Sequence, residues 1–208
     1  MQSLSDLLVD AATVARNTVK EEIDKHGSVL ESGNFYQSSL SYLLDAMIWN
    51  LYNRKLHVME TIVQNIKKDK SVLDLGCASG VTGLVLLKLG YDVSFSDFSG
   101  APQLVINRLE PKRFFPYGKE PVCDWVVALD VIEHVANPLS FVRWIYELCH
   151  IGAIVTYPIL PVWQPPYQKL EIDNYVDTEL LLPVIRKLFR ISYMTEIDGG
   201  HEFVLRRK

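Results

Sequence analysis

Several acidic side chains and one histidine stand where short apolar segments of the sequence end. Asp74 lies inside such a segment, Asp97 and Asp130 each end one, and Glu133 and His134 follow shortly afterwards. Asp130, Glu133 and His134 have the spacing i, i+3, i+4, which places side chains on one face of a helical turn. The imidazole titrates near neutrality and can accept a proton from a hydroxyl group. The three groups together could instead hold a divalent ion such as Mg²⁺.

The segment Ser71–Gly90, which reads SVLDLGCASGVTGLVLLKLG, contains elements that would position such groups. Its apolar start is typical of a buried parallel strand. The residues of Gly76–Gly80 are small, so the backbone can turn sharply and a ligand can come close. From Val81 the apolar spacing becomes helical, and Gly90 is suited to end the helix. The segment predicts a strand, a loop and a helix, as in a nucleotide-binding βαβ unit.

Other classes of nucleotide site also use a glycine loop. No Lys-Ser or Lys-Thr pair follows the glycines, which excludes the phosphate-binding loop of nucleoside triphosphatases. A dinucleotide-binding loop needs a third small residue three positions after Gly80, and Gly83 stands there. An NAD(P)-binding enzyme is therefore an alternative that the downstream sequence has to decide.

Two stretches resemble the class I S-adenosylmethionine (SAM) methyltransferases. Residues 72–80, VLDLGCASG, resemble motif I of that family, V-L-D-L-G-C-G-x-G, with Ala78 where glycine is usual. Residues 130–138, DVIEHVANP, resemble the D-x-I/L-E-H-V-x-x-P stretch of members related to the ubiquinone-biosynthesis O-methyltransferases. The resemblance extends over roughly residues 55–208. It implies SAM as the cofactor and S-adenosylhomocysteine (SAH) as the product.

The resemblance also assigns roles to residues. Asp97 would accept hydrogen bonds from the ribose hydroxyls, and Phe98 would pack on the adenine ring. The acidic residue that contacts the adenine amino group in the family has no clear counterpart in residues 114–122, FFPYGKEPV. The set expected at the cofactor is Asp74, Gly76, Cys77, Ala78, Gly80, Asp97, Phe98, Leu129 and Asp130.

The predicted fold is a Rossmann-like α/β sheet of seven strands in which the seventh is antiparallel. A strand over 191–197, a turn at 198–200 and a strand over 201–205 would supply the antiparallel pair. A dinucleotide fold does not need this pair, so its presence favours the methyltransferase. Gly152 is expected to end the helix that begins at Leu139.

The chain is expected to contain a helical N-terminal cap, residues 1–54, and one compact SAM-binding domain, residues 55–208. A helix starting at Ser3 or Ser5 should end near Gly27. The aromatic segment 35–52 could cover the ligand cleft or simply pack on the sheet, and the two interpretations are compatible.

Composition limits the partners and the compartment. The 208 residues are 49% hydrophobic with a formal net charge of −4, which gives no basic surface for duplex nucleic acid. Three widely spaced cysteines do not suggest disulfides or a zinc site. No segment has the length and apolarity of a membrane span, and the start does not resemble a signal peptide. A cytoplasmic location is therefore expected.

The predicted function is SAM-dependent methyl transfer by in-line displacement to the oxygen of a small-molecule acceptor. His134 is the candidate base, with a purely structural role as the alternative. Asp130, Glu133 and His134 are a secondary metal candidate, with no metal as the main expectation. A nucleic-acid or protein methyltransferase, an NAD(P)-binding enzyme and a non-catalytic subunit of the same fold remain alternatives. The acceptor and the oligomeric state are open.

Overall fold

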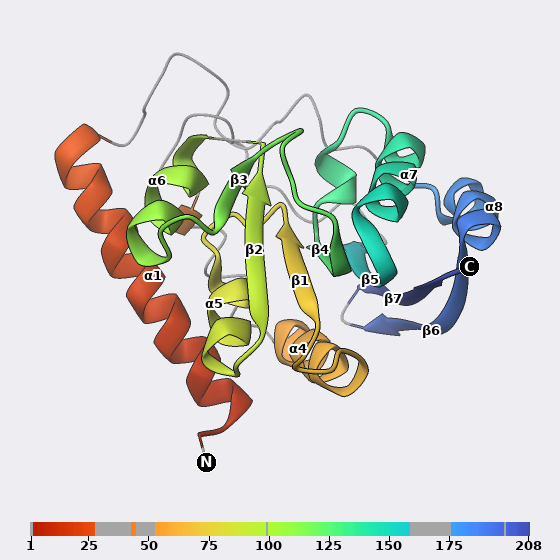
Figure 1. Ribbon diagram of the computed structural model, residues 1–208, viewed down its shortest axis with the longest axis horizontal. Helices are drawn as coiled ribbons and strands as arrows, with labels where there is room; N and C mark the ends of the chain where they lie inside the picture. Colours follow the sequence, from red (N-terminus) through yellow and green to blue (C-terminus); the bar gives the residue numbers. More distant parts are fainter. Residues whose placement is uncertain (1, 28–42, 45–52, 99, 159–175, 198) are drawn as a thin grey trace. The chain divides into compact units, whose positions relative to one another are not determined.

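The computed structural model describes residues 2–27, 43–44, 53–98, 100–158, 176–197 and 199–208. Helices and strands alternate along most of this part of the chain (Figure 1). In chain order they are α1 (Leu4–His26), α4 (Asn53–Asn65), β1 (Ser71–Leu75), α5 (Val81–Lys88), β2 (Asp92–Asp97), α6 (Gly100–Leu109), β3 (Phe114–Pro116), β4 (Cys123–Leu129), the 3-10 turn η1 (Ile132–His134), α7 (Pro138–Leu148), β5 (Cys149–Pro158), α8 (Thr178–Leu188), β6 (Phe189–Ile197) and β7 (Gly200–Arg207).

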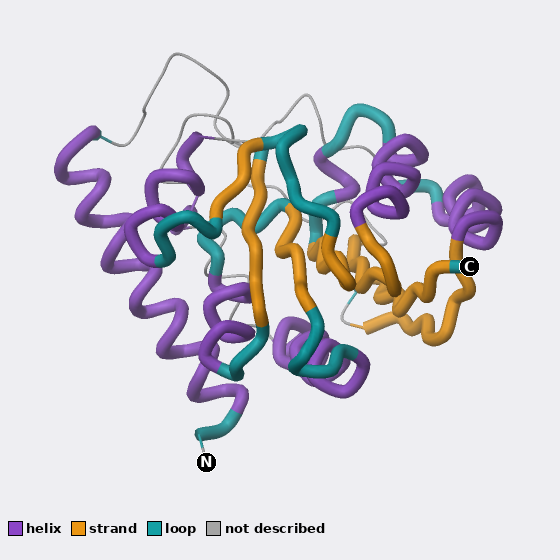
Figure 2. Tube along the Cα trace, viewed as in Figure 1, coloured by secondary structure: helices purple, strands orange, loops and turns teal. Residues whose placement is uncertain are grey.

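The strands form one seven-stranded sheet in the order β3-β2-β1-β4-β5-β7-β6, drawn in orange in Figure 2. β1 pairs in parallel with β2, β2 with β3, and β4 with β5. β7 runs antiparallel to both of its neighbours, β5 and β6. The predicted fold class, including the antiparallel seventh strand, is confirmed.

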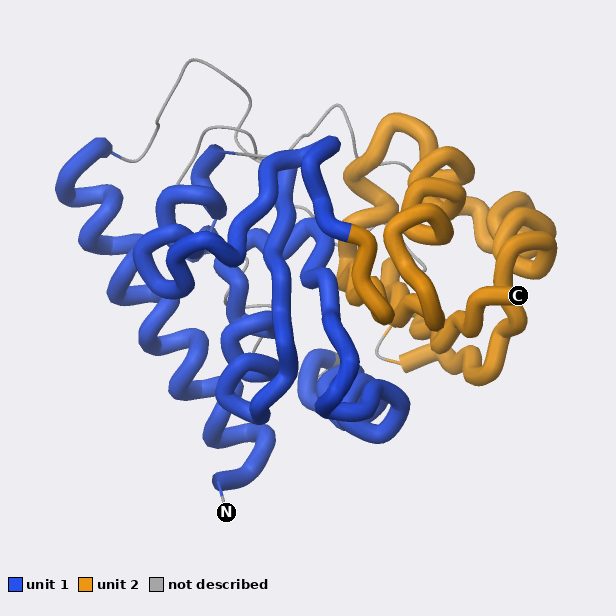
Figure 3. Tube along the Cα trace, in the orientation of Figure 1, with its two compact units in different colours: residues 1–121 blue, residues 122–208 orange. Residues whose placement is uncertain are grey.

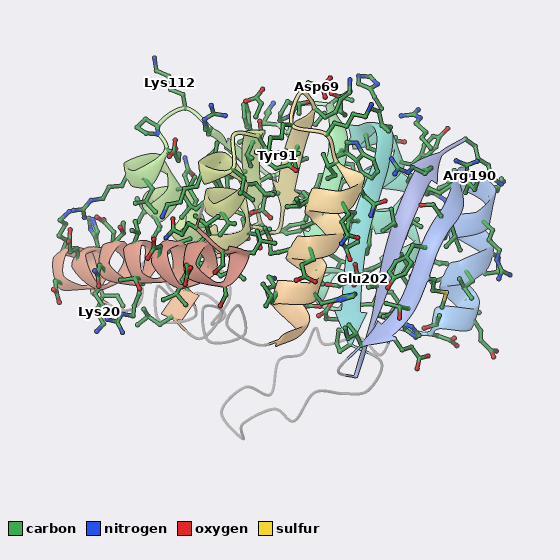
Figure 4. All side chains as sticks on the ribbon, turned by 90° about the horizontal axis from the view of Figure 1, so that it is seen from below. Lys20, Asp69, Tyr91, Lys112, Arg190 and Glu202 are labelled. Atoms are coloured by element: carbon green, nitrogen blue, oxygen red, sulfur yellow. The ribbon has the colours of Figure 1, made fainter. Side chains whose placement is uncertain are left out.

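The described chain divides into two compact units, residues 1–121 and 122–208 (Figure 3). In the first unit β1 is the centre of the core, because Val72, Leu73 and Leu75 are completely buried. Both neighbouring helices α5 and α6 pack on β2. Tyr91, which precedes β2 and is labelled in Figure 4, donates a hydrogen bond to the carbonyl of Ile66 after α4. Burial on both faces explains why the first strand reads as a continuous apolar run.

Helix α1 begins where its sequence predicts. Ser3 is the N-cap, and a capping box joins it to Asp6: each side chain accepts a hydrogen bond from the other residue's backbone N–H. The helix ends at His26, and Gly27 follows with φ +81°. α1 packs against α4, α5 and α6. Arg108 of α6 donates hydrogen bonds to Glu21 and Glu22 of α1, which adds an ionic link to this packing.

The N-terminal cap remains a prediction. Its first helix, α1, belongs to the same compact unit as β1–β3. Most of the aromatic segment 35–52 lies outside the described residues, apart from 43–44, which are helical. The proline- and aromatic-rich segment 159–175 also lies outside the described residues.

One expectation in the second unit was wrong. Gly152 does not end α7, which stops at Leu148; it lies within β5. A Cβ atom at Gly152 would come within 2.1 Å of the Leu205 carbonyl oxygen and 3.1 Å of the Trp125 ring. Glycine is required at this position because β7 approaches β5 closely. In the sequence alone, such a glycine looks the same as one that ends a helix.

Cys77, Cys123 and Cys149 are all buried, and the structure forms no disulfide among them. Among the described residues, none of the helices combines the length and the apolar character that a membrane crossing needs.

Candidate functional site

The loop after β1 has an unusual backbone. Gly76, Ala78 and Gly80 all have positive φ, at 72°, 46° and 74°. Two of these positions carry glycine, which adopts this conformation at little cost, but Ala78 does not. Three left-handed residues among five produce the sharp turn that separates β1 from α5. Ala78 is thus a locally strained residue at the position where the family motif has glycine.

The same loop is fastened to the end of β2. The amides of Gly76 and Cys77 both donate to the carbonyl of Ser96, at 2.8 and 3.0 Å. The Ala78 amide donates to Oδ2 of Asp97 at 2.9 Å. The carboxylate predicted to bind ribose therefore also holds the backbone of the loop.

Asp74 is a buried carboxylate that links β1 to α5. Its Oδ2 accepts a hydrogen bond from the Gly83 amide at 2.9 Å, and its side chain is almost fully covered. Burial raises its pKa to about 6, although the positive charge of Lys55 and the Gly83 hydrogen bond oppose this shift. The nearby charge of Asp97 raises the pKa further. Two carboxylates therefore lie beside the loop, and their negative charge favours a cationic ligand.

Gly83 has a packing explanation. A Cβ atom there would lie 2.2 Å from the Phe95 ring and 2.9 Å from Oδ2 of Asp74. Only glycine lets α5 approach β2 this closely, which is also the role of the third glycine in dinucleotide-binding loops. Gly83 therefore does not distinguish between the two cofactor classes.

The remaining loop side chains are not nucleophiles. Burial raises the pKa of the Cys77 thiol well above its ordinary value, and the charges of Asp97 and Asp74 act in the same direction. The Ser79 hydroxyl is buried and has no hydrogen-bond partner among the residues that the structure describes. The loop can surround and orient a ligand, but its chain offers no activated thiolate.

An aromatic pair and a glutamate follow β2 and β3. Phe98 stacks on Tyr117 with ring centroids 4.2 Å apart, and both side chains are about half exposed. Glu120 accepts hydrogen bonds from the Ser96 hydroxyl at 2.8 Å and the Gly118 amide at 3.0 Å. Sequence reasoning singled out Phe98 but missed Tyr117 and Glu120. The available signal was an aromatic residue and a carboxylate flanking Gly118, directly after the short strand β3.

In the second unit, Asp130 follows β4 with φ +56°. Its amide donates to the carbonyl of Thr156 at 3.0 Å and to the Thr156 hydroxyl at 3.1 Å. The Thr156 hydroxyl in turn donates to Oδ1 of Asp130 at 2.9 Å. Leu129, the last residue of β4, is buried and in register with Thr156. The backbone and the carboxylate of Asp130 are thus both fixed by one residue at the end of β5.

His134 ends the 3-10 turn η1, and its amide donates to the carbonyl of Val131 at 3.0 Å. Its side chain is 35% exposed, and Nε2 lies 3.8 Å from Oε1 of the buried Glu133. The arrangement suits a side chain that accepts a proton from a ligand and is then stabilised by its neighbour.

The three metal candidates do not share an α-helical face. Asp130 is left-handed and precedes the turn, and only Glu133 and His134 belong to it. In the part of the chain that the structure describes, no group of three or more His, Cys, Asp or Glu side chains is arranged to hold a metal ion.

A second histidine was missed by sequence reasoning. His201 is the second residue of β7 and lies in register with Tyr157 of β5, and the two ring centroids are 5.3 Å apart. Burial lowers the pKa of His201, while Glu196, 3.9 Å from Nδ1, opposes that shift. The Tyr157 hydroxyl donates to Oγ1 of Thr178 at 3.1 Å. Only strand pairing brings His201 to the end of β5, where the sequence itself has no histidine.

Comparison with known proteins decides between the cofactor classes. The family model described as "Methyltransferase domain" matches residues 49–158, more than half of the chain. This chain belongs to the methyltransferase domain family. The match contains β1 to β5 and therefore both loops described above. The cofactor of this methyltransferase is SAM, which confirms the prediction and sets aside the NAD(P) alternative.

Individual relatives of this methyltransferase are distant. A ubiquinone biosynthesis O-methyltransferase of Pseudoalteromonas translucida (strain TAC 125) is 29% identical over 104 residues. That match covers 44% of this chain and 44% of the relative, so it spans less than half of the relative's length.

Solved structures agree with the fold of this methyltransferase. The magnesium protoporphyrin IX methyltransferase of Synechocystis PCC 6803, solved with bound SAM, matches with a TM-score of 0.60 at 15% identity. The match covers 96% of this chain and 97% of that enzyme. A SAM-dependent methyltransferase of Aquifex aeolicus matches with a TM-score of 0.56 at 16% identity, over 78% of this chain and 98% of that one.

Proposed function

We propose that this methyltransferase transfers the methyl group of SAM to an oxygen atom of a small molecule. The loop after β1 is the observation that supports SAM as the methyl donor. In this loop Asp97 accepts a hydrogen bond from the left-handed Ala78, and the carboxylates of Asp74 and Asp97 lie nearby. The distant likeness to a ubiquinone biosynthesis O-methyltransferase supports oxygen as the acceptor atom. The net charge of −4 supports a small molecule over nucleic acid.

The loops after β1 and β2 would bind the cofactor. Gly76, Ala78 and Gly80 leave room beside the backbone, and the carboxylate of Asp97 can accept from the ribose hydroxyls. Phe98 offers an aromatic face, already stacked on Tyr117, to the adenine. SAM is cationic at its sulfonium and amino groups, so the negative charge of Asp74 and Asp97 favours it.

The residues after β4 would act on the acceptor and on the reacting end of the cofactor. Bound SAM supplies an activated methyl group, so the protein's task is to hold nucleophile, methyl and sulfur in line. Leu129 and Asp130, at the carboxyl end of β4, are proposed to line the cofactor. His134 would accept the proton of the hydroxyl nucleophile and be stabilised by Glu133 as imidazolium.

The decisive experiment has two stages. Mass spectrometry of the purified protein would identify any SAM, SAH or acceptor bound to it, and calorimetry would measure the affinity for added SAM. A panel of phenols, alcohols and amines would then be assayed for SAH formation. A phenol or alcohol should turn over, and turnover of amines alone would contradict oxygen as the acceptor atom.

His134→Ala provides the test of the base once an acceptor is known. Turnover should fall about 10²–10⁴-fold while SAM affinity stays near that of the wild type. His150→Ala, an exposed histidine at the start of β5, is the matched control and should retain full activity. An active His134→Ala enzyme would leave His134 a structural residue.

We also place this methyltransferase in the cytoplasm as part of the proposal. Three buried cysteines that form no disulfide with one another are compatible with a reducing compartment. Fractionation of expressing cells would check the location, and recovery from an oxidising compartment would contradict it.

A further inference from the structure

Thr156 makes an unusually complete set of contacts with Asp130. It contributes two acceptors for one amide, the carbonyl at 3.0 Å and the hydroxyl at 3.1 Å. Its hydroxyl also donates to the Asp130 carboxylate at 2.9 Å. Thr156 is 1% exposed and lies in β5 directly opposite Leu129, so its own position is fixed by the parallel ladder.

Asp130 needs such an external restraint. A left-handed conformation is unfavourable for a residue other than glycine, although aspartate tolerates it better than most. Strained residues of this kind persist where their surroundings determine their conformation, and they concentrate at functional sites. The bonds from Thr156 define both the backbone turn and the orientation of the side chain. The direction of the carboxylate is therefore set by β5, not by the preference of Asp130.

We propose that Thr156 is a positioning residue that holds the Asp130 carboxylate in the orientation in which it binds the cationic cofactor. The proposal rests on the proposed function, because it takes Asp130 to be a cofactor-binding residue. Thr156 holds Oδ1 with a neutral hydroxyl, so the carboxylate keeps the negative charge that attracts a cationic ligand while its direction is fixed. A carboxylate that kept its charge but lost its orientation would bind the cofactor less well.

The hydroxyl group, more than the methyl group, should carry this role. Thr156→Val has nearly the same shape and keeps the β5 ladder, including the carbonyl that accepts from Asp130. It removes the hydroxyl that contacts both the amide and the carboxylate. Thr156→Ser keeps the hydroxyl and removes only a buried methyl group, so it should restore the function of the site.

The experiment measures SAM affinity of the wild type and of these variants by calorimetry. Thr156→Val should bind SAM about tenfold more weakly, as expected for the loss of one charge-assisted hydrogen bond, and Thr156→Ser should bind within about threefold of the wild type. Thr178→Val, which removes a different threonine hydroxyl in the same unit, is the matched control and should bind normally.

A double-mutant cycle separates positioning from a general structural effect. If Thr156 acts through Asp130, then Thr156→Val should lower affinity in the wild type and have no further effect in an Asp130→Ala background. An equal loss in both backgrounds would overturn the proposal, as would normal SAM binding by a folded Thr156→Val protein. If Thr156→Val does not fold, full binding by Asp130→Ala would overturn it instead.

The outcomes also separate this inference from the proposed function. A wild-type protein that binds neither SAM nor SAH would overturn both. A wild type that binds SAM together with an unaffected Thr156→Val variant would overturn the role of Thr156 alone.

Discussion

The loops after β1 and after β4 each hold a left-handed residue in place, but with different chemical groups. Each contains one left-handed residue other than glycine, Ala78 with φ 46° and Asp130 with φ 56°. Each of these residues donates its amide to a side chain at the carboxyl end of the next strand in its own unit, Asp97 of β2 or Thr156 of β5. In the first loop the restraining group is charged, whereas in the second it is a neutral hydroxyl.

This difference assigns different sensitivities to the two loops. Ala78 has no polar side chain to orient, so its loop should respond to added bulk and to changes in the carboxylates around it. Asp130 has a carboxylate that is itself held by Thr156, so its loop should respond to the loss of that hydroxyl. The predictions below test the contrast, beginning with the largest expected effect.

Ala78→Leu should abolish SAM binding. We expect the methionine part of the cofactor to lie against the loop, and a leucine side chain at the left-handed Ala78 position would fill that space. Calorimetry should detect no binding, while circular dichroism should show an intact fold. Ala78→Gly is the control that should still bind. Tight SAM binding by a folded Ala78→Leu protein would show that the cofactor does not approach this position.

Asp74→Asn should stabilise the protein above pH 6. The pKa of Asp74 is raised from 3.8 to about 6 in the folded protein, so folding favours the protonated carboxyl group. The stability that this group contributes is therefore fully present below pH 3.8 and is lost as the pH rises through 6. Asparagine still accepts from the Gly83 amide and carries no charge. At pH 8 the gain should be on the order of 2–3 kcal/mol, vanishing below pH 4.

Urea unfolding at pH 4 to 8 measures this effect. Asp69→Asn is the matched control, because Asp69 is exposed in the turn before β1. The same Asp74→Asn substitution should weaken SAM binding, since it removes a negative charge beside the loop. Equal unfolding free energies for the wild type and Asp74→Asn at pH 8 would mean that the charge of Asp74 does not destabilise the folded protein.

Asp97→Ala should weaken SAM binding by about 1–3 kcal/mol, because it removes acceptors for the ribose and for the Ala78 amide. Asp97→Asn can still accept the hydrogen bond from the Ala78 amide, so it should lose less SAM affinity. Asp92→Ala, on the exposed opposite end of β2, should bind normally. Calorimetric affinities for the three variants would decide, and unchanged affinity for Asp97→Ala would remove this residue from the cofactor site.

Glycine substitutions compare the two loops directly and should have the smallest effects. Ala78→Gly relieves a left-handed residue without losing a side-chain contact, so the free energy of unfolding should rise by up to about 1 kcal/mol. Asp130→Gly relieves the same strain but loses the hydrogen bond to the Thr156 hydroxyl, so the free energy of unfolding should fall by about 1 kcal/mol. Changes of the same sign would mean that the two loops are restrained alike.

Local patterns in the sequence determined most of the secondary structure. The strand, small-residue loop and helix of 71–90 appear as β1, the loop and α5. The capping box at Ser3 and the final strand pair were also predictable. Each of these depends on neighbours in the chain: apolar periodicity, a cap residue, or a short turn between strands.

The tertiary structure alone decided how the site is held together. The bond between Ala78 and Asp97 joins residues 19 positions apart, and those between Asp130 and Thr156 join residues 26 positions apart. His201 reaches Tyr157 only through the β5–β7 ladder, and Gly152 is explained only by the backbone of β7. The sequence shows that these residues are small, ionisable or hydroxylic. Which strand lies next to which, and in what register, determines the partner that each of them contacts.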